Sequence, residues 1–491
     1  MKLSLITGLA ATALSLAGCA VGPSYQRPRI SLTGHFMTAT PAIQPGKPSA
    51  ALDAWWQGFG DPELVRVVER ARAQNLDLEQ ARARILQSRA AAKAAGAALA
   101  PQASTMASAA DEQQSLLNPI GEIGRRLPGY DRNVDIYDVG AAASWEIDLF
   151  GGLRRARDAA RADARASEAQ AAAVQISVTA DAADAYLKVR AFQARIAVAQ
   201  RQEAIEQDLV NLLTLRSAEG VAADRELRLS RAELESVRAS IPPLIAGRDA
   251  QFNRLDVLMG AQPGTWRDEL AASTPLPDPP AIAAGAPADL LRRRPDVLAA
   301  EQALIAANAR IGAAVADYYP KLSLLGLFGV ESIDAGELFT GDALQHQVSA
   351  GLSWRLFDFG RVDAEVAQAR GRDAEALAAY RASILRASED VENALSNLVQ
   401  QQARAQALDR QIAELTVARG QAQQAYDGGV ISLIEVRDAD RDLLTASDQL
   451  VLAKADAARA AVAAFRALGG GWPAPRTPVQ AAVAKPADRG A

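Results

Sequence analysis

The chain has 491 residues, of which 53 are basic and 58 acidic, so its formal charge is −5. A nucleic-acid-binding protein would normally show an excess of basic residues, and this balance argues against that class. The single cysteine excludes an intrachain disulfide, and with only two histidines, His35 and His346, a metal site is not expected. No catalytic constellation or phosphate-binding glycine loop is visible. We therefore expect neither an enzyme nor a bound cofactor.

The chain begins with an export signal. Lys2 precedes a short apolar run, Leu3–Leu16, which ends in small residues and predicts a signal peptide over residues 1–18. The run closes as LAGC, which resembles the bacterial lipobox, so Cys19 is expected to be the acylated first residue of the mature protein. An ordinary signal peptide with a chance cysteine is the alternative. Ala20 follows, and in lipoproteins the absence of aspartate at this position favours transfer to the outer membrane.

The rest of the chain is a tandem duplication. Trp145 and Trp354 lie 209 positions apart, whereas the upstream prolines Pro101 and Pro320 lie 219 apart. The difference of ten residues falls between the proline and the tryptophan, which indicates a change of loop length between strands. The shift of 209 also relates Phe150 to Phe359, Gly151 to Gly360, Gly220 to Gly429 and Gly260 to Gly469.

Both repeats have the same predicted order: a helix ending near a proline, two strands, a very long helix, a Gly-Val turn and a shorter helix. A lipidated segment, 19–62, precedes them and a flexible tail, 471–491, follows. The first repeat, 63–287, is predicted to hold a helix, a β-hairpin over about 101–150, a long helix over 152–218, a tip at 219–223, a helix over 224–260 and an equatorial belt over 261–287. The second, 288–470, is predicted to hold a helix over 295–318, a hairpin over about 320–359, a long helix over 361–427, a tip at 428–431 and a helix over 432–468.

Periodicity supports these assignments. From Val139 to Ile147, apolar residues alternate with more polar ones, and the strand that leads to Trp354 has the same period of two. Residues 153–219 contain neither glycine nor proline, and sixty-odd helical residues make a rod of roughly 100 Å. The apolar residues along this rod form a narrow seam, as in coiled-coil packing. Pro242-Pro243 predicts a kink or local break in the shorter helix, and Asn118–Arg132 predicts a long loop.

The strands are the only candidates for crossing a membrane. After the signal peptide, no apolar run approaches the ~20 residues of a membrane helix. Four strands cannot close a barrel, and an open sheet edge cannot lie in lipid because its backbone groups would lack partners. Two copies would give eight strands and a filled interior, whereas three would give twelve and space for a channel. A soluble, half-buried sheet is the alternative.

Several motifs occur in the order found in one family: GPSYQRP, WWQGFGDPEL, RRRPDVLAAEQALIAANARIGAA, YDGGV and LGGGW. With these motifs the chain resembles TolC-type outer-membrane channels, and most of all the NodT-like lipoprotein branch that serves resistance-nodulation-division (RND) efflux pumps. The resemblance implies an α+β membrane protein of duplicated strand-pair and long-helix hairpins. It implies a homotrimer that forms a 12-stranded β-barrel on a periplasmic α-helical barrel, with a periplasmic adaptor and an inner-membrane RND pump as partners.

The same resemblance assigns roles to the two helical tips. Gly220 and Val221 in the first tip, and Gly429 and Val430 in the second, are implied to form the periplasmic entrance and to meet the adaptor. Glycine permits the tight backbone turn at each tip.

The resemblance further implies a periplasmic gate. Tyr426 latches the tip to neighbouring helices, and Glu435 and Asp438 project into the closed entrance as rings of like charge that favour cations. Glu435 stands where an aspartate is expected, which leaves its reach into the pore open. A solvated helix face is the alternative, because Arg437 and Arg441 lie nearby in the sequence.

The tryptophans mark where strands end and rods begin. Trp145 and Trp354 are expected on the apolar, lipid-facing side near the inner membrane interface, where amphipathic rings are favoured. The Phe-Gly pair that follows each one marks the bend into helix. The expected function is that of a passive exit duct of a tripartite RND-type pump, exporting drugs or other small molecules. A duct for type I protein secretion and a periplasm-spanning lipoprotein scaffold without a pore are the alternatives.

Overall fold

The computed structural model describes residues 20–30, 35–38, 51–221, 223–282, 290 and 293–473. The predicted signal peptide, Cys19, one residue of the first tip, part of the belt and the tail after residue 473 lie outside the described residues. The chain divides into two compact units. The first comprises residues 1–29, 85–167 and 300–380, and the second comprises residues 30–84, 168–299 and 381–491.

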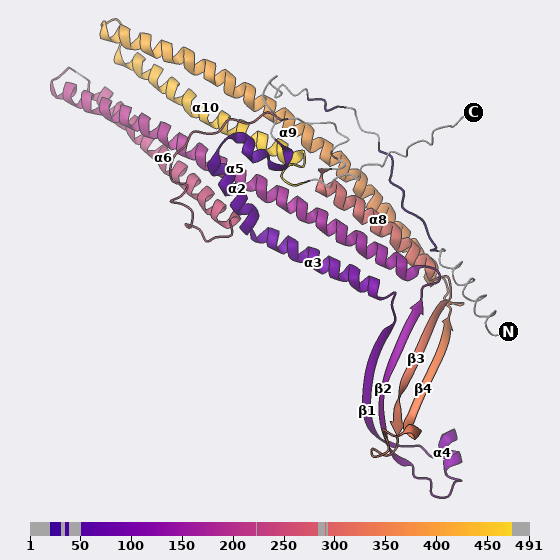
Figure 1. The fold of residues 1–491 in the computed structure, drawn as a ribbon. Coiled ribbons are helices and arrows are strands. Elements are labelled where there is room, and N and C mark those ends of the chain that lie inside the picture. The colour runs from indigo at the N-terminus through magenta and orange to yellow at the C-terminus, as the bar shows by residue number, and fades with distance from the viewer. Residues whose placement is uncertain are drawn as a thin grey trace, which may run out of the picture. The chain divides into compact units, whose positions relative to one another are not determined.

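The first unit holds a four-stranded antiparallel sheet in the order β1-β2-β3-β4 (Figure 1). β1 and β2 belong to the first repeat and β3 and β4 to the second, so the central β2–β3 pairing joins the repeats. A short 3-10 helix, η2, precedes β4, and the β1–β2 connection contains a short helix, α4, instead of a plain loop. The bounds are Gln102–Gln113 for β1, Pro119–Gly124 for α4, Asn133–Ile147 for β2, Lys321–Ser332 for β3, Gly341–Ala343 for η2 and Leu344–Ser353 for β4.

The helix α4 has a local cause. The Asn118 side chain accepts a hydrogen bond from the backbone N–H of Gly121, and Pro119 occupies the first helical position. An asparagine cap followed by proline is a strong helix-start signal. The predicted loop over Asn118–Arg132 is therefore wrong at its start.

The two β-hairpins have equivalent registers. Gln102 pairs with Ser144 in the first hairpin, and Lys321 pairs with Ser353 in the second. The first members of these pairs differ by 219 positions and the second members by 209, the same two shifts that align the sequences. The duplication therefore holds residue by residue in the sheet.

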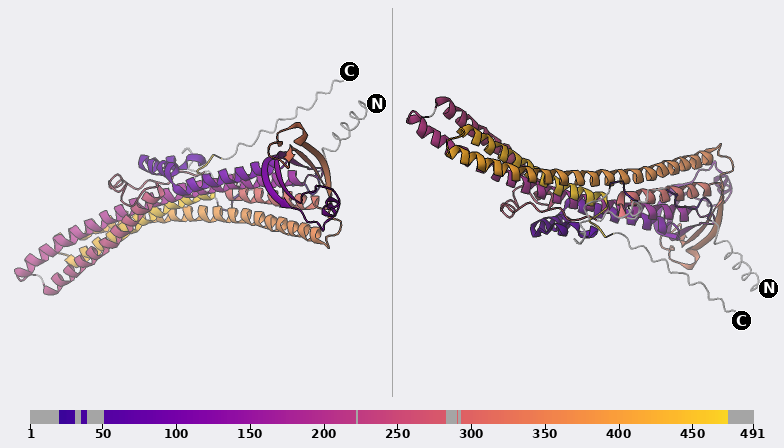
Figure 2. Two further views of the ribbon diagram at one scale, coloured as in Figure 1. Left: turned by 90° about the horizontal axis from the view of Figure 1, so that it is seen from below. Right: turned by 90° about the horizontal axis from the view of Figure 1, so that it is seen from above.

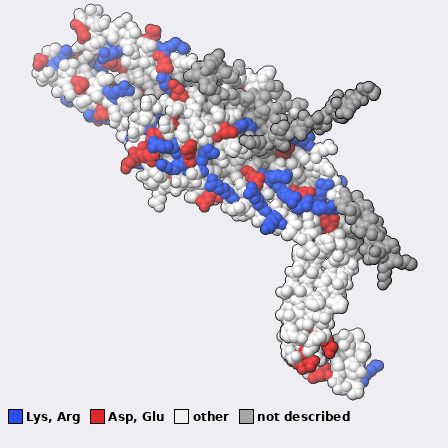
Figure 3. All heavy atoms as spheres, in the orientation of Figure 1, with Lys and Arg blue, Asp and Glu red and all other residues white. Residues whose placement is uncertain are grey.

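The middle of the sheet carries few charges. Figure 3 shows the visible sheet surface as almost entirely uncharged, with acidic groups gathered at the end near α4. In β1, the charged residues are Asp111 and Glu112, at that same end. On one face, the register aligns Trp145 with Leu324 and Leu324 with Ala350. The sheet thus has an uncharged band with an apolar face.

Long helices make up most of the rest of the chain. In the second unit, the ends of α5 and α6 form one hairpin and those of α9 and α10 another, each turning at a tip (Figures 1 and 2). Among the described helices, none combines the length and hydrophobicity needed to cross a membrane. The bounds are Leu52–Phe59 for the 3-10 helix η1, Pro62–Gln74 for α2, Leu76–Ala97 for α3, Gly152–Ala218 for α5, Asp224–Leu258 for α6, Pro295–Ala316 for α8, Arg361–Asp427 for α9 and Leu433–Ala467 for α10.

The helix α6 continues through Pro242 and Pro243, so of the kink or local break predicted there, the break does not occur. Each proline removes one N–H donor from the helix, which leaves the carbonyls of Arg238 and Ala239 without their usual partners. Both prolines are exposed, and water can satisfy those carbonyls at the surface. The free-energy cost of the two lost hydrogen bonds is thereby reduced, and the helix continues through the prolines.

The motifs WWQGFGDPEL and LGGGW pack together in the second unit. Trp55 and Trp56 are almost fully buried, and Trp55 stacks on Phe465 with ring centroids 5.3 Å apart. The backbone N–H of Gly471 donates to the Leu52 carbonyl at 2.8 Å, and the indole of Trp472 donates to the Arg293 carbonyl at 3.0 Å. The first two residues of the predicted flexible tail, Gly471 and Trp472, are therefore hydrogen-bonded to the body of the unit.

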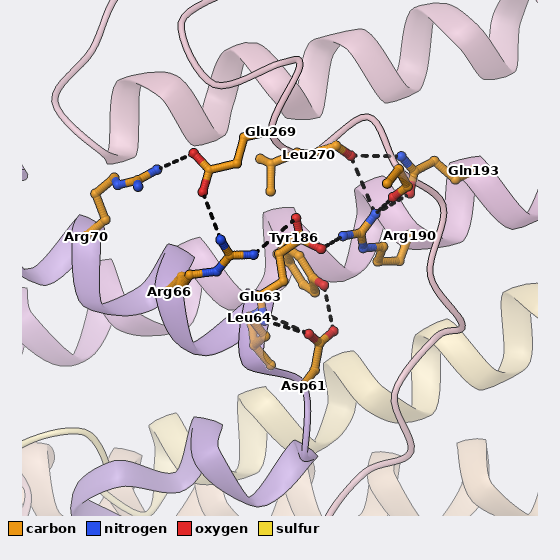
Figure 4. A network of polar contacts seen from close by, with 11 residues as sticks. Asp61, Glu63, Leu64, Arg66, Arg70, Tyr186, Arg190, Gln193, Glu269 and Leu270 are labelled. Atoms are coloured by element: carbon orange, nitrogen blue, oxygen red, sulfur yellow. Dashed lines mark hydrogen bonds and ion pairs between the residues drawn. The ribbon is translucent and has the colours of Figure 1, made fainter.

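A buried polar network ties α2 to α5 in the second unit (Figure 4). Asp61 caps α2 through the backbone N–H groups of Glu63 and Leu64, and its other oxygen accepts from the Tyr186 hydroxyl at 2.6 Å. Arg190 is fully buried and forms an ion pair with Glu63. Its guanidinium also donates to the side chain of Gln193 at 2.8 Å and to backbone carbonyls of the belt, those of Leu270 and Ala272. This network fixes the N-terminal segment and the belt to the long helix.

Candidate functional site: the helix tips

The two tips end their helices in the same way. Gly220 and Gly429 have φ values of 73° and 74°, and each follows the last turn of a 67-residue helix. In each tip, the next residue donates its N–H to the carbonyl five positions back, Val221 to Arg216 and Val430 to Ala425. This is the Schellman motif, in which a glycine in the left-handed region closes the helix. Val221 and Val430 are both mostly exposed.

The same motif ends the two shorter helices, at Gly260 and Gly469, with φ values of 71° and 72°. Their surroundings differ from those of the tips. A Cβ atom added to Gly260 would lie 2.4 Å from the carbonyl oxygen of Gln74, whereas one added to Gly429 would meet nothing within 4 Å.

We therefore expect alanine to be much more damaging at Gly260 than at Gly429. Gly429→Ala carries only the conformational cost of the left-handed region, about 1 kcal/mol. Gly260→Ala adds a clash with backbone and costs at least about twice as much. Thermal unfolding followed by the helical circular dichroism signal measures both variants. Equal midpoints of unfolding for the two variants would show that the close approach of Gln74 to Gly260 does not affect stability.

Tyr426 connects the two tips. Its hydroxyl accepts a hydrogen bond from Arg216 at 2.8 Å, so the last turn of α9 is bonded to the last turn of α5. The backbone carbonyl of Tyr426 also accepts from the N–H of Gly429 in its own tip. Tyr426 thus lies between the two predicted docking turns.

A buried ion pair lies behind Tyr426. Arg437 of α10 donates to Glu206 of α5 at 2.5 Å, with side-chain exposures of 19% and 6%. Burial raises the pKa of the Glu206 carboxyl, and the charge of Arg437 opposes this effect. A further ion pair, Arg419 to Asp440 at 2.8 Å, joins α9 to α10. The Arg437–Glu206 pair holds the two helical hairpins of one chain together, and the Arg419–Asp440 pair joins the two arms of the second hairpin.

The two predicted gate acids have different local partners in this chain. Glu435 completes a capping box with Ser432 at the start of α10, which satisfies backbone donors at the helix end. Asp438 forms an ion pair with Arg441 at 3.0 Å, and both side chains are more than half exposed. Glu435 therefore stabilises the start of α10, whereas Asp438 is among the residues that line a cavity at the tips.

A half-open cavity of about 460 Å³ lies between the two hairpins at the tips. Its walls combine leucines of α5 and α6 with the polar groups just described, and Leu209, Leu213 and Leu227 form part of the apolar cluster beside it. Within the described part of the chain, no group of three or more histidine, cysteine, aspartate and glutamate side chains is placed to hold a metal ion.

Glu206 and Arg216 were not predicted from the sequence, and Arg437 was named there only as a neighbour of the gate acids. One signal was available for Glu206, which lies three positions before the buried Leu209 and therefore on the apolar seam of α5. A carboxylate at a seam position indicates a buried partner.

The strand-to-helix junctions lie in the first unit. The indole N–H of Trp145 donates to the Leu99 carbonyl at 3.0 Å, and that of Trp354 donates to the Tyr318 carbonyl at 2.9 Å. The two carbonyls are again 219 positions apart. Each tryptophan thus fastens the end of its strand to the end of the preceding helix, and both rings remain partly exposed.

The segment that follows Cys19 is bound at the first junction. The N–H of Val21 donates to the Phe150 carbonyl at 3.1 Å. Further along, Tyr25 and Arg27 both donate to the nearly buried carboxylate of Glu301, at 3.2 Å and 2.6 Å. This N-terminal strap, residues 20–29, covers part of α8.

Comparisons with known proteins agree with this geometry. The family model of the outer membrane efflux proteins matches residues 67–261 and 286–470. The chain is 33% identical over 423 residues to the pyoverdine export outer membrane protein OpmQ of Pseudomonas putida, covering 86% of this chain and 88% of OpmQ. It is 31% identical over 476 residues to the toluene efflux pump outer membrane protein TtgF of Pseudomonas putida, covering 94% of this chain and 96% of TtgF.

Among solved structures, the outer-membrane channel OprN has a TM-score of 0.83 and 32% identity, covering 92% of this chain and 100% of the OprN chain. The α+β fold of a duplicated strand pair and long-helix hairpin is that of these channels.

Proposed function

This chain belongs to the outer membrane efflux protein family, and we propose that it forms the exit duct of a tripartite RND-type pump. In this role three copies close a twelve-stranded barrel in the outer membrane, and their long helices form a tunnel through the periplasm. The duct is passive and has no catalytic role. The observation that carries the proposal is a four-stranded sheet with an uncharged band joined directly to two 67-residue helices.

The tips are the proposed entrance. Arg216–Tyr426 and Glu206–Arg437 keep the two hairpins of one copy together, which corresponds to a closed resting entrance. A periplasmic adaptor docks on the exposed Val221 and Val430 beside the tip glycines, and opening separates the hairpins. Of the two acids, Asp438 is the one whose carboxylate is proposed to face the pore, because Glu435 is engaged in its capping box.

The membrane anchor is proposed at the first junction. Ala20, the residue after Cys19, approaches Gly151 so closely that a Cβ on that glycine would lie 2.8 Å from the Ala20 Cβ. An acyl chain on Cys19 would then begin at the level where β2 passes into α5. The partly exposed rings of Trp145 and Trp354 mark the same end of the sheet, which fits a membrane interface position.

The exported compounds are proposed to be small molecules, drugs among them, and to be selected by the pump. The named relatives serve compounds as different as pyoverdine and toluene. A duct that passes compounds of such different chemistry must be wide and cannot depend on specific contacts with them. We therefore expect this chain to select little among the exported compounds.

The mass and the heat-modifiable mobility of the purified protein test the proposal. We expect a trimer in detergent that runs as a compact, SDS-resistant species until it is heated. A monomer without heat-modifiable mobility would favour a scaffold without a pore. Restored export of small toxic compounds in cells that lack their outer-membrane duct distinguishes the efflux role from protein secretion.

A further inference from the structure

The cavity at the tips has walls from both hairpins of the chain. The first hairpin contributes Leu209 and Leu213 of α5 together with one face of α6. The second contributes Tyr426 of α9 and the first turns of α10, including Leu433. The volume of about 460 Å³ lies within the range of small-molecule sites, about 300–1,000 Å³. The cavity therefore has the size of a pocket for a small ligand.

The lining offers apolar surface that other side chains of the chain leave in water. Leu229 of α6 and Ile434 of α10 both line the cavity, and each is more than half exposed. Leu209 and Leu213 line the same cavity from a buried apolar cluster. An apolar ligand that covers Leu229 and Ile434 would remove their surface from water, which favours binding.

The charged groups of the lining are not balanced. Each of its arginines has a partner: Arg216 donates to the Tyr426 hydroxyl, Arg437 pairs with Glu206, and Arg441 pairs with Asp438. Two half-buried carboxylates of α6, those of Glu226 and Glu233, also line the cavity. Neither of them forms an ion pair or a side-chain hydrogen bond within the described residues. Four carboxylates thus face three guanidinium groups, and the excess negative charge belongs to α6.

The two α6 carboxylates act on the same space. Glu226 and Glu233 are seven positions apart, so they share one face of the helix. Burial raises the pKa of the Glu206 carboxyl, and the negative charge of Glu233 adds to this rise. A cationic ligand would supply the missing counter-charge, whereas an anionic ligand would add to the repulsion between the carboxylates.

From these observations we propose that the cavity binds a lipophilic cation. The charge of the ligand lies beside Glu226 and Glu233. Its apolar body covers Leu229 and Ile434. This assignment concerns binding to the tip and holds whether or not the chain forms a duct.

The bound cation should also keep the entrance closed. Because the walls come from both hairpins, separation of the hairpins removes one side of the site. A ligand that binds one of two states shifts the equilibrium toward that state. This closing effect deepens the proposed function and rests on it, since it needs an entrance that opens and closes.

Binding of tetraphenylphosphonium to the purified protein in lipid nanodiscs tests the site. This cation is compared with tetraphenylborate, an anion of nearly the same size and shape, and empty nanodiscs measure the uptake of each ion by lipid. We expect equilibrium dialysis to show saturable binding of the cation and no binding of the anion beyond that of empty nanodiscs. Saturable binding of the anion, or uptake of neither ion beyond that of the lipid, would overturn the proposal.

Two variants show whether the α6 carboxylates hold the cation. Glu226→Gln with Glu233→Gln should raise the Kd for tetraphenylphosphonium at least about tenfold, since contacts with a charged group are worth a factor of this order or more. Glu235→Gln is the matched control, because this carboxylate of the same helix pairs with Arg238 and is mostly exposed. The control should leave the Kd unchanged. An unchanged Kd in the double variant would place the cation elsewhere and overturn the proposal.

The closing effect is measured separately, as the frequency of openings in planar bilayers with tetraphenylphosphonium added on the side of the tips. At ten times its Kd the cation should lower this frequency about tenfold, because a ligand specific for the closed form shifts the equilibrium by a factor of about 1 + [L]/Kd. The double variant should lose the effect at the same concentration.

Two results would overturn the closing effect: an unchanged frequency of openings in the wild type, or a reduction that persists in the double variant and thus reflects block of the pore itself. A trimeric, inserted protein that shows no openings under any condition would instead remove the proposed function, and the binding experiment would still decide the site.

Discussion

Replacement of Glu63 by alanine should lower the free energy of unfolding by about 3–5 kcal/mol, because it leaves a buried cation without its counter-charge. Arg190 is fully buried, and Glu63 is its ion-pair partner. The other partners of Arg190 include neutral oxygens of Gln193 and of two belt carbonyls and the ring of Tyr186, none of which can replace a carboxylate. The measurement is thermal unfolding of the purified protein followed by the helical circular dichroism signal.

Two variants serve as controls for this prediction. Glu269→Ala removes a partly exposed carboxylate that pairs with Arg66 and Arg70, and an exposed pair of this kind contributes only about 0–1 kcal/mol. The double variant Glu63→Gln with Arg190→Met removes both buried charges and should recover most of the loss, because no unpaired charge remains. A single Glu63→Ala variant as stable as Glu269→Ala would show that the buried network is not what fixes α2 and the belt to α5.

Replacement of Arg437 by alanine should open the tip. Arg437 is the counter-charge of the nearly buried Glu206, and without it a carboxylate is left between two hairpins. Separation of the hairpins would return Glu206 to water, so the variant should favour the open entrance. Cells that carry it should become sensitive to a large hydrophilic antibiotic that the outer membrane normally excludes. Arg441→Ala, which breaks the exposed pair with Asp438, is the matched control and should have little effect.

The effect of Arg437→Ala should depend on pH. Burial raises the pKa of Glu206 above its usual value, and Glu233 and Asp440 raise it further. When the pKa of a carboxyl is raised in the closed form, the protonated carboxyl stabilises the closed form at low pH. This stabilisation is lost as the pH rises through the raised pKa. The variant should therefore leak more at neutral than at acidic pH. Leakage that rises toward acidic pH would contradict the role of Glu206, and Glu206→Gln with Arg437→Ala should abolish the dependence.

The periodic features of the sequence were sufficient to predict the architecture. Glycines at fixed intervals mark helix ends, because the left-handed φ at a Schellman motif excludes most other residues. Alternation of apolar and polar residues marks strands, because successive side chains of a strand point to opposite faces of the sheet. The shifts of 209 and 219 reappear in the strand registers and in the carbonyls bound by Trp145 and Trp354.

The candidate site was harder to predict from the sequence than the fold was. Glu206 and Arg437 are 231 positions apart, and only the packing of two hairpins brings them together. The capping box was predictable, since Ser432 and Glu435 have the required spacing of three. The unbroken course of α6 through its proline pair could not be predicted, because exposure to water decides the effect of the prolines and exposure at one helix position is not a property of the local sequence.

The conductance of the purified protein in planar bilayers tests the central claim, that this chain forms a gated duct. We expect the wild type to show small, infrequent openings, and the Arg437→Ala variant to show large, long-lived ones with the same preference for cations. An absence of conductance from both proteins, when each is trimeric and inserted in the bilayer, would contradict a duct of any kind.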